Sequence, residues 1–150
     1  MSKIDHLDHR ILQALSQDGR ISNVDLSAKI GLSASACLRR VQEMERIGVI
    51  AGYRVVLNPA AMGVGFVAYV AVGLSRHTKD EQHAFETAIN LAAQVRECHN
   101  VTGTFEYLLR VETIDLSAYK HFHTEVLGAL PQVSTITSFV VMGSHKDERG

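Results

Sequence analysis

The amino-acid sequence predicts an α+β protein in two parts. Residues 21–48 have the pattern of two short helices joined by a tight turn at Gly31. From residue 62 onward, segments rich in β-branched residues alternate with amphipathic helical segments in the order β-α-β-β-α-β. We therefore expect a helix-turn-helix domain over residues 1–50, a strand or hinge linker over 51–61, and a ferredoxin-like domain over 62–150.

The first helix is expected over residues 4–18. Apolar residues recur at helical spacing on one face, and the pair Asp18-Gly19 ends the pattern. That face consists of Leu7, Ile11, Leu12 and Leu15. This helix supplies the third member of a small three-helix domain.

The second helix begins at Ser22, which has the chemistry of an N-cap. Asp25 follows three residues later, the spacing of a capping box. Gly31 ends the helix, because that position favours a residue that tolerates positive φ. We expect the buried face of this helix to be Val24, Leu26 and Ile30.

The third helix begins after Ser33 and has one apolar side. That side is expected to consist of Ala36, Cys37, Leu38, Val41, Met44 and Ile47. The exposed side then carries small polar residues and a pair of arginines at its N-terminal half. This arrangement is typical of the helix that enters the DNA major groove, and an ordinary helical hairpin is the alternative.

We predict DNA contacts from two places in this motif. Base-edge contacts are assigned to Ser33, Ala34, Ser35 and Arg39, with Arg40 sharing that task or reaching phosphate. Ser22 and Asn23 are assigned to phosphate. The alternative for the two arginines is a solvated helix face on which Glu43 is their ion partner.

The charge of the chain is divided unequally between its two parts. The net charge is −1, but residues 1–57 carry eight Lys and Arg against six Asp and Glu. A domain this weakly basic binds phosphate poorly by itself. We therefore expect double-stranded DNA to be bound by several copies of the chain acting together.

The second part is expected to contain four strands and two helices. The strands are predicted over residues 64–74, 95–102, 105–112 and 133–142, and the helices over 79–93 and from 115 or 117 to 130, with Thr78 capping the first. Before them, Val49–Leu57 is predicted to form one or two short strands, and Asn58-Pro59 marks the boundary.

The predicted sheet has one face that no helix covers. The first and last strands offer apolar residues on both faces, including Val67, Tyr69 and Phe139. Monomers rarely keep such a surface exposed, so we expect the same face of another copy to cover it in a symmetric dimer.

Over nearly its whole length the chain resembles the Lrp/AsnC (feast/famine) transcriptional regulators, closest to the leucine-responsive branch. The matching stretches are LDHRILQALSQDGRISNVDLSAKIGLS, CLRRVQEMERIGVIAGYRVVLNP, ECHNVTGTFEYLLRV, DLSAYKHF and LPQVSTITSFVVM. The resemblance implies a winged helix-turn-helix domain and a ligand-sensing ferredoxin-like (RAM) domain. It also implies homodimers that assemble into tetramers, octamers or hexadecamers, with an amino acid bound between dimers.

The resemblance also locates an effector site. It implies that Thr102, Gly103, Thr104, Phe105 and Glu106 form the effector loop. Glu106 would accept the ammonium group of an amino acid and the backbone near Gly103 its carboxylate, while Leu116, Val140 and Val141 line the side-chain pocket. The family pattern Gly-Asp-aromatic-Asp reads Gly-Thr-Phe-Glu here, and a plain glycine hairpin turn is the alternative.

The alternative to a transcription regulator is an enzyme. Some relatives of this architecture are sirohaem decarboxylases with a His and Arg constellation, for which Arg96, His99 and Arg110 are the nearest candidates here. These residues do not match that pattern, so we expect a protein that is not an enzyme and needs no cofactor.

We expect neither a metal site nor a membrane partner. His121 and His123 diverge on one helix, and His77 and His83 lack further ligands. No segment has the length of a membrane span or the pattern of a signal peptide. With the two cysteines expected as thiols, the sequence predicts a cytoplasmic protein.

Overall fold

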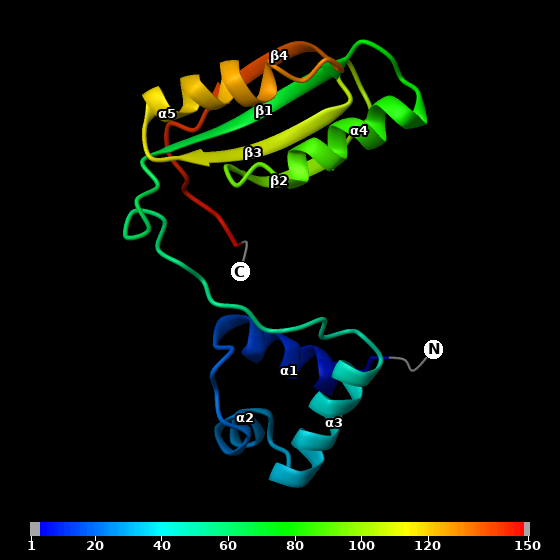
Figure 1. The fold of residues 1–150 in the computed structure, drawn as a ribbon. Coiled ribbons are helices and arrows are strands. Elements are labelled where there is room, and N and C mark those ends of the chain that lie inside the picture. Colours follow the sequence, from blue (N-terminus) through cyan, green and yellow to red (C-terminus); the bar gives the residue numbers. More distant parts are fainter. Residues whose placement is uncertain (1–3, 149–150) are drawn as a thin grey trace. The chain divides into compact units, whose positions relative to one another are not determined.

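The computed structural model describes residues 4–148, which form two compact units divided near residue 56. The N-terminal unit contains the helices α1 (His6–Gln17), α2 (Asn23–Ile30) and α3 (Ala34–Arg46) (Figure 1). Their shared core consists of Ile11, Ala14, Leu26, Ile30, Cys37 and Met44. The three predicted helices are therefore present.

Helix α1 begins two residues later than predicted, because a capping box fixes its start. The amide of Asp8 donates to the carboxylate of Asp5 at 2.9 Å, and the amide of Asp5 donates back to Asp8 at 3.0 Å. At α2, by contrast, the side chain of Ser22 accepts a hydrogen bond from the amide of Asp25 at 3.1 Å. The described residues show no reciprocal bond from the Ser22 amide to Asp25, so only half of the predicted capping box is present.

Three apolar residues that were expected in the core of this unit lie at the surface. The exposed fractions are 67% for Val24, 44% for Leu38 and 36% for Ile47. In a bundle of three short helices each helix meets its neighbours along a narrow stripe. Apolar residues beside that stripe therefore remain in contact with solvent.

The prediction of strands over residues 49–57 was wrong for the single chain. No strand is assigned between α3 and residue 66, and Val55 and Val56 are 77% and 74% exposed. The β-branched composition favours an extended conformation, but a strand also needs a neighbouring strand to accept and donate its hydrogen bonds.

The C-terminal unit is an antiparallel four-stranded sheet in the order β2-β3-β1-β4 (Figure 1). Its strands are β1 (Phe66–Leu74), β2 (Val95–Asn100), β3 (Tyr107–Thr113) and β4 (Val133–Val140). Helix α4 (Lys79–Asn90) follows β1, and α5 (Leu116–His121) follows β3 and continues as the π-helix η1 (Phe122–Leu127). The predicted β-α-β-β-α-β order is confirmed, with element ends that differ by a few residues.

Both helices pack on the same face of the sheet. Alternate residues of β1, among them Val70 and Val72, share one core with Phe85 of α4 and Tyr119 of α5. We call the opposite face of the sheet the open face. On β1 it consists of Val67, Tyr69, Ala71 and Gly73. The residues that pair with these four on the neighbouring strands belong to the same face.

The open face is less uniformly apolar than the sequence predicted. Tyr69 lies between Arg110 of β3 and Phe139 of β4 in one cross-strand row. Phe139 is 55% exposed, whereas Arg110 is only 8% exposed although it is charged. The face therefore combines apolar residues of β1 and Phe139 of β4 with two threonines of β4 and charged side chains of β2 and β3.

Candidate DNA-binding helix and effector loop

The turn between α2 and α3 is built by local capping bonds. Gly31 has φ of 83° and ends α2 in the left-handed region, as predicted. Two residues later Ser33 accepts a bond from the amide of Ala36 at 3.2 Å and so begins α3. The sequence signals for both helix ends are confirmed.

Two side chains hold the three helices together around this turn. The guanidinium of Arg10 on α1 donates to the carbonyls of Ile30 and Lys29, at 3.1 and 3.2 Å, and so satisfies the C-terminal end of α2. The side-chain amide of Asn23 donates to the carbonyl of Ala34 at 2.8 Å. Asn23, which the sequence assigned to phosphate, thus links α2 to α3.

The N-terminal half of α3 presents the residues that were predicted to contact bases. Ser33, Ala34, Ser35 and Arg39 are all exposed. Within residues 4–148 no hydrogen bond or ion pair is recorded for the guanidinium of Arg39, so its donors face solvent. A guanidinium in this state can donate two parallel bonds to the edge of guanine.

Arg40 lies in a different environment from Arg39. One of its nitrogens is 2.8 Å from a carboxylate oxygen of Asp5 and 2.9 Å from one of Asp8, so it joins α3 to the capping box of α1. The bond from the Asp8 amide, together with Arg40, holds the pKa of Asp5 below its ordinary value. The structure therefore brings Arg40 to α1 rather than to the face that carries Arg39.

Glu43 is not the partner of these two arginines. It forms a two-point ion pair with Arg46, at 2.8 and 2.6 Å, which lowers the pKa of Glu43. The pairing of Arg39 and Arg40 with Glu43 is therefore wrong, although Arg39 does lie on a solvated helix face.

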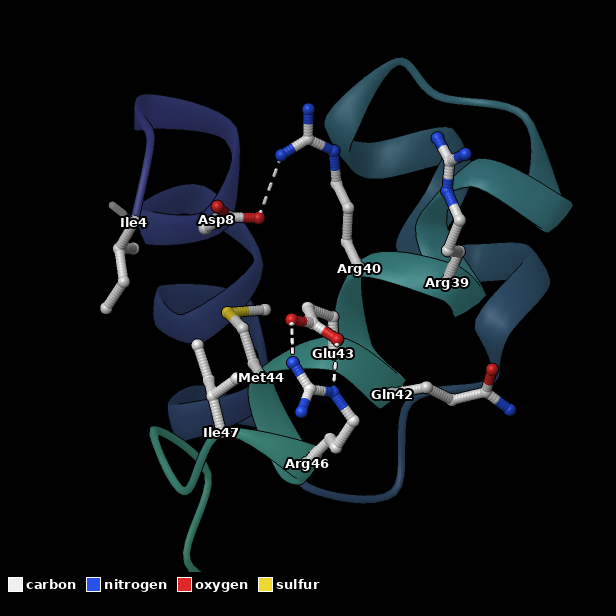
Figure 2. A pocket seen from close by; sticks show the side chains of 9 residues that line it. All are labelled: Ile4, Asp8, Arg39, Arg40, Gln42, Glu43, Met44, Arg46 and Ile47. Atoms are coloured by element: carbon white, nitrogen blue, oxygen red, sulfur yellow. Dashed lines mark hydrogen bonds and ion pairs between the residues drawn. The ribbon is translucent and has the colours of Figure 1, made fainter. Parts of the chain in front are cut away.

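A cavity of about 440 Å³ lies beside this ion pair, between α1 and α3. Figure 2 shows apolar side chains of Ile4, Met44 and Ile47 on one side of it and charged groups of α3 around them. None of the residues predicted to bind an effector lines this cavity. The cavity belongs to the N-terminal unit alone.

The predicted effector loop connects β2 to β3. The amide of Val101 donates to the carbonyl of Glu106 at 2.9 Å and closes the loop, and Gly103 at its tip has φ of 125°. Thr102, Gly103 and Thr104 are exposed, and Phe105 is half-buried. No bond from the backbone amides of Gly103 and Thr104 is recorded in the described part of the chain, which leaves them available to a carboxylate.

Both carboxylate oxygens of Glu106 are engaged. One accepts from the backbone amide of Leu74 at 2.7 Å, and the other lies 2.8 Å from Nε2 of His77. No sequence pattern connects His77 with this loop, because His77 and Glu106 are far apart in the chain. The pairing of β1 with β3 brings them together.

The predicted pocket residues lie at the other end of the sheet. The loop adjoins β1 at Val72, whose carbonyl accepts from Glu106. Val140 instead pairs with Ala68, and Leu116 follows the end of β3 that pairs with Phe66. Ala68 and Leu74 are separated by roughly 20 Å along an extended strand. One chain therefore does not bring Glu106 together with Leu116, Val140 and Val141.

The residues considered for an enzyme site are held in ion pairs on the open face. Arg110 lies 3.1 Å from Glu112 and 3.9 Å from Glu97, and His99 lies 3.3 Å from Glu97. The guanidinium of Arg110 also lies 5.7 Å from the centre of the Tyr69 ring. Arg96 is exposed at the register shift of β2 and does not join this group.

Two further findings concern residues 4–148. No group of three or more His, Cys, Asp or Glu side chains there is arranged to hold a metal ion. No helix in the same range combines the length and apolar character needed to cross a membrane.

Family models match both units of the chain. The model described as Lrp/AsnC ligand binding domain matches residues 67–150, and the one described as winged helix-turn-helix DNA-binding matches residues 4–51. The second match covers α1, α2 and α3, the helices that present Ser33 and Arg39.

Curated relatives and a solved structure agree with these matches. The proline dehydrogenase transcriptional activator of Rhizobium radiobacter is 42% identical over 96% of this chain and 92% of its own length. The leucine-responsive regulatory protein of Escherichia coli K12 is 42% identical over 93% of this chain and 85% of its own. A transcriptional regulator of Neisseria meningitidis, solved in complex with L-methionine, has a TM-score of 0.93 at 32% identity and covers 97% of this chain and 94% of its own.

Proposed function

Because this chain belongs to the Lrp/AsnC family of transcriptional regulators, we propose that it binds specific DNA sequences and that an amino acid modulates its assembly or DNA affinity. The observation that carries the proposal is the α2–Gly31–α3 motif, which presents Ser33–Ser35 and the exposed guanidinium of Arg39 on one helix end.

Within this proposal Arg39 contributes most to sequence recognition, because its guanidinium donates two hydrogen bonds to one guanine. Ser33, Ala34 and Ser35 contact base edges beside it, and Ser22 contributes a phosphate contact at the start of α2. Arg40 supports the orientation of α3 through Asp5 and Asp8. Asn23 supports it through its bond to Ala34.

The DNA-bound form is proposed to be at least a dimer. The N-terminal part carries only two positive charges more than negative ones, so one copy would hold DNA weakly. The exposed Phe139 and the apolar residues of β1 beside it on the open face support pairing of two copies. Two copies related by a two-fold axis would present two α3 helices to two half-sites. Assembly into tetramers, octamers or larger rings is the further expectation.

The effector is proposed to lie between copies of the chain. Glu106 and the free amides near Gly103 suit the ammonium and carboxylate of an amino acid, but the apolar residues Leu116, Val140 and Val141 are at the far end of β1. Their separation supports a site completed by a second copy. The L-methionine in the Neisseria relative supports an amino acid as the ligand class.

An enzyme of the sirohaem-decarboxylase kind is the less favoured reading. Arg110 and His99, the residues it would need, are engaged with Glu97 and Glu112. We propose that the protein is not an enzyme, uses no cofactor, and acts in the cytoplasm.

Selection of binding sites from random duplex DNA, followed by calorimetry with each of the twenty amino acids, tests this proposal. We expect a two-fold symmetric consensus sequence and heat of binding with at least one amino acid. Absence of any enriched sequence would refute DNA recognition. A coloured protein that ignores DNA would favour the enzyme.

A further inference from the structure

The carboxylate of Glu106 has one oxygen that the fold holds in place. This oxygen accepts from the backbone amide of Leu74 at 2.7 Å. The register of the β1–β4 pairing shifts between Gly73 and Leu74. Glu106 therefore accepts the hydrogen bond of the Leu74 amide at a point where the pairing of the strands is irregular. The side chain of Glu106 is only 20% exposed. Its position is therefore set by the sheet.

The other oxygen has an exchangeable partner. It lies 2.8 Å from Nε2 of His77, in the segment between β1 and α4. The side chain of His77 is 71% exposed, so it can turn away from Glu106 without opening the core. An imidazole that donates to a carboxylate occupies the place that any other cationic donor would need.

We propose that His77 competes with the amino-acid effector for Glu106 and thereby sets effector affinity. This inference rests on the proposed function, in which Glu106 accepts the effector's ammonium group. An ammonium that donates to this oxygen needs the place that the imidazole N–H of His77 now occupies. His77 must therefore leave when the effector binds.

The test is calorimetry with the twenty amino acids on the exhaustively dialysed full chain. The variants are His77→Ala and, as a matched control on an exposed histidine of α4, His83→Ala. We expect His77→Ala to bind the tightest-binding amino acid about threefold to tenfold more tightly than the unmodified chain does. His83→Ala should bind it with the affinity of the unmodified chain.

Failure of this inference can be distinguished from failure of the proposed function. If the unmodified chain binds an amino acid and His77→Ala binds it with the same affinity, the competition is refuted while amino-acid sensing stands. If neither the unmodified chain nor His77→Ala binds any of the twenty, both are overturned. Because His77 is exposed, a thermal melt should show all variants folded.

Discussion

The guanidinium of Arg40 lies 2.9 Å from the carboxylate of Asp8 and joins α3 to α1. The same nitrogen lies 2.8 Å from Asp5, and the two acids also cap each other's amides. One cation therefore bridges both carboxylates at the start of α1 and links them to α3. Arg39, its neighbour in sequence, remains exposed to solvent.

We expect Arg40→Ala to lower the melting temperature of the N-terminal unit and to weaken binding to all DNA sequences by a similar factor. The slope of log affinity against log salt should not change, because no phosphate contact is lost. Arg39→Ala is the matched control. It should keep the melting temperature and relax preference at one base pair by about 1–3 kcal/mol. A reduced salt slope with normal stability in Arg40→Ala would instead place Arg40 on phosphate.

Asp5→Asn should make the N-terminal unit less sensitive to acid. The amide of Asp8 and the guanidinium of Arg40 lower the pKa of Asp5 in the folded chain. A lowered pKa contributes stability above the ordinary pKa of aspartate, and this contribution is lost as pH falls through the lowered value. Asparagine preserves the N-cap but does not titrate. Melting temperatures measured by circular dichroism from pH 6 to pH 2.5 should therefore fall less for the variant, and parallel curves would contradict this.

Local signals in the sequence predicted the helix ends, because the groups that form them are a few residues apart. Ser22, Ser33 and Thr78 cap helices as expected, and Gly31 ends α2. The partners of Arg40 and Glu106 could not be found in this way. Asp8 lies 32 residues from Arg40, and only the packing of α1 on α3 brings the two together. His77 lies 29 residues from Glu106, and only the register of the sheet brings these two together.

The open face shows a second limit of sequence patterns. Alternating apolar residues of β1 and β4 predicted an apolar open face, and Phe139 is an apolar residue of that face. The charged residues of β2 and β3 were not assigned to that face, because strand order and register place Arg110 opposite Tyr69. Likewise, residues 49–57 have strand composition without a strand beside them in this chain.

Gly73→Ala should destabilise the C-terminal unit and weaken effector binding. A Cβ at this position would overlap the hydroxyl of Thr135 and approach the carboxylate of Glu106. Overpacking of this kind costs about 1–3 kcal/mol. Thr135→Ala removes the overlapping hydroxyl, so the double variant should recover most of the loss in urea unfolding. Additive losses in the double variant would show that the overlap is not the cause.

Phe139→Glu should convert the assembled protein to single chains. Phe139 is 55% exposed on the open face beside Tyr69, so a carboxylate there leaves the fold of one chain intact but is unfavourable in an apolar interface. Sedimentation should show loss of the dimer, and affinity for the selected DNA should fall by at least the ~10²-fold that avidity supplies. Leu91→Glu is the matched control, because Leu91 is 85% exposed at the end of α4 and the charge change is the same. If Phe139→Glu remains a dimer, the open face does not form the interface. If it becomes a single chain that still binds DNA tightly, the proposal that pairing compensates for a weakly basic N-terminal unit is refuted.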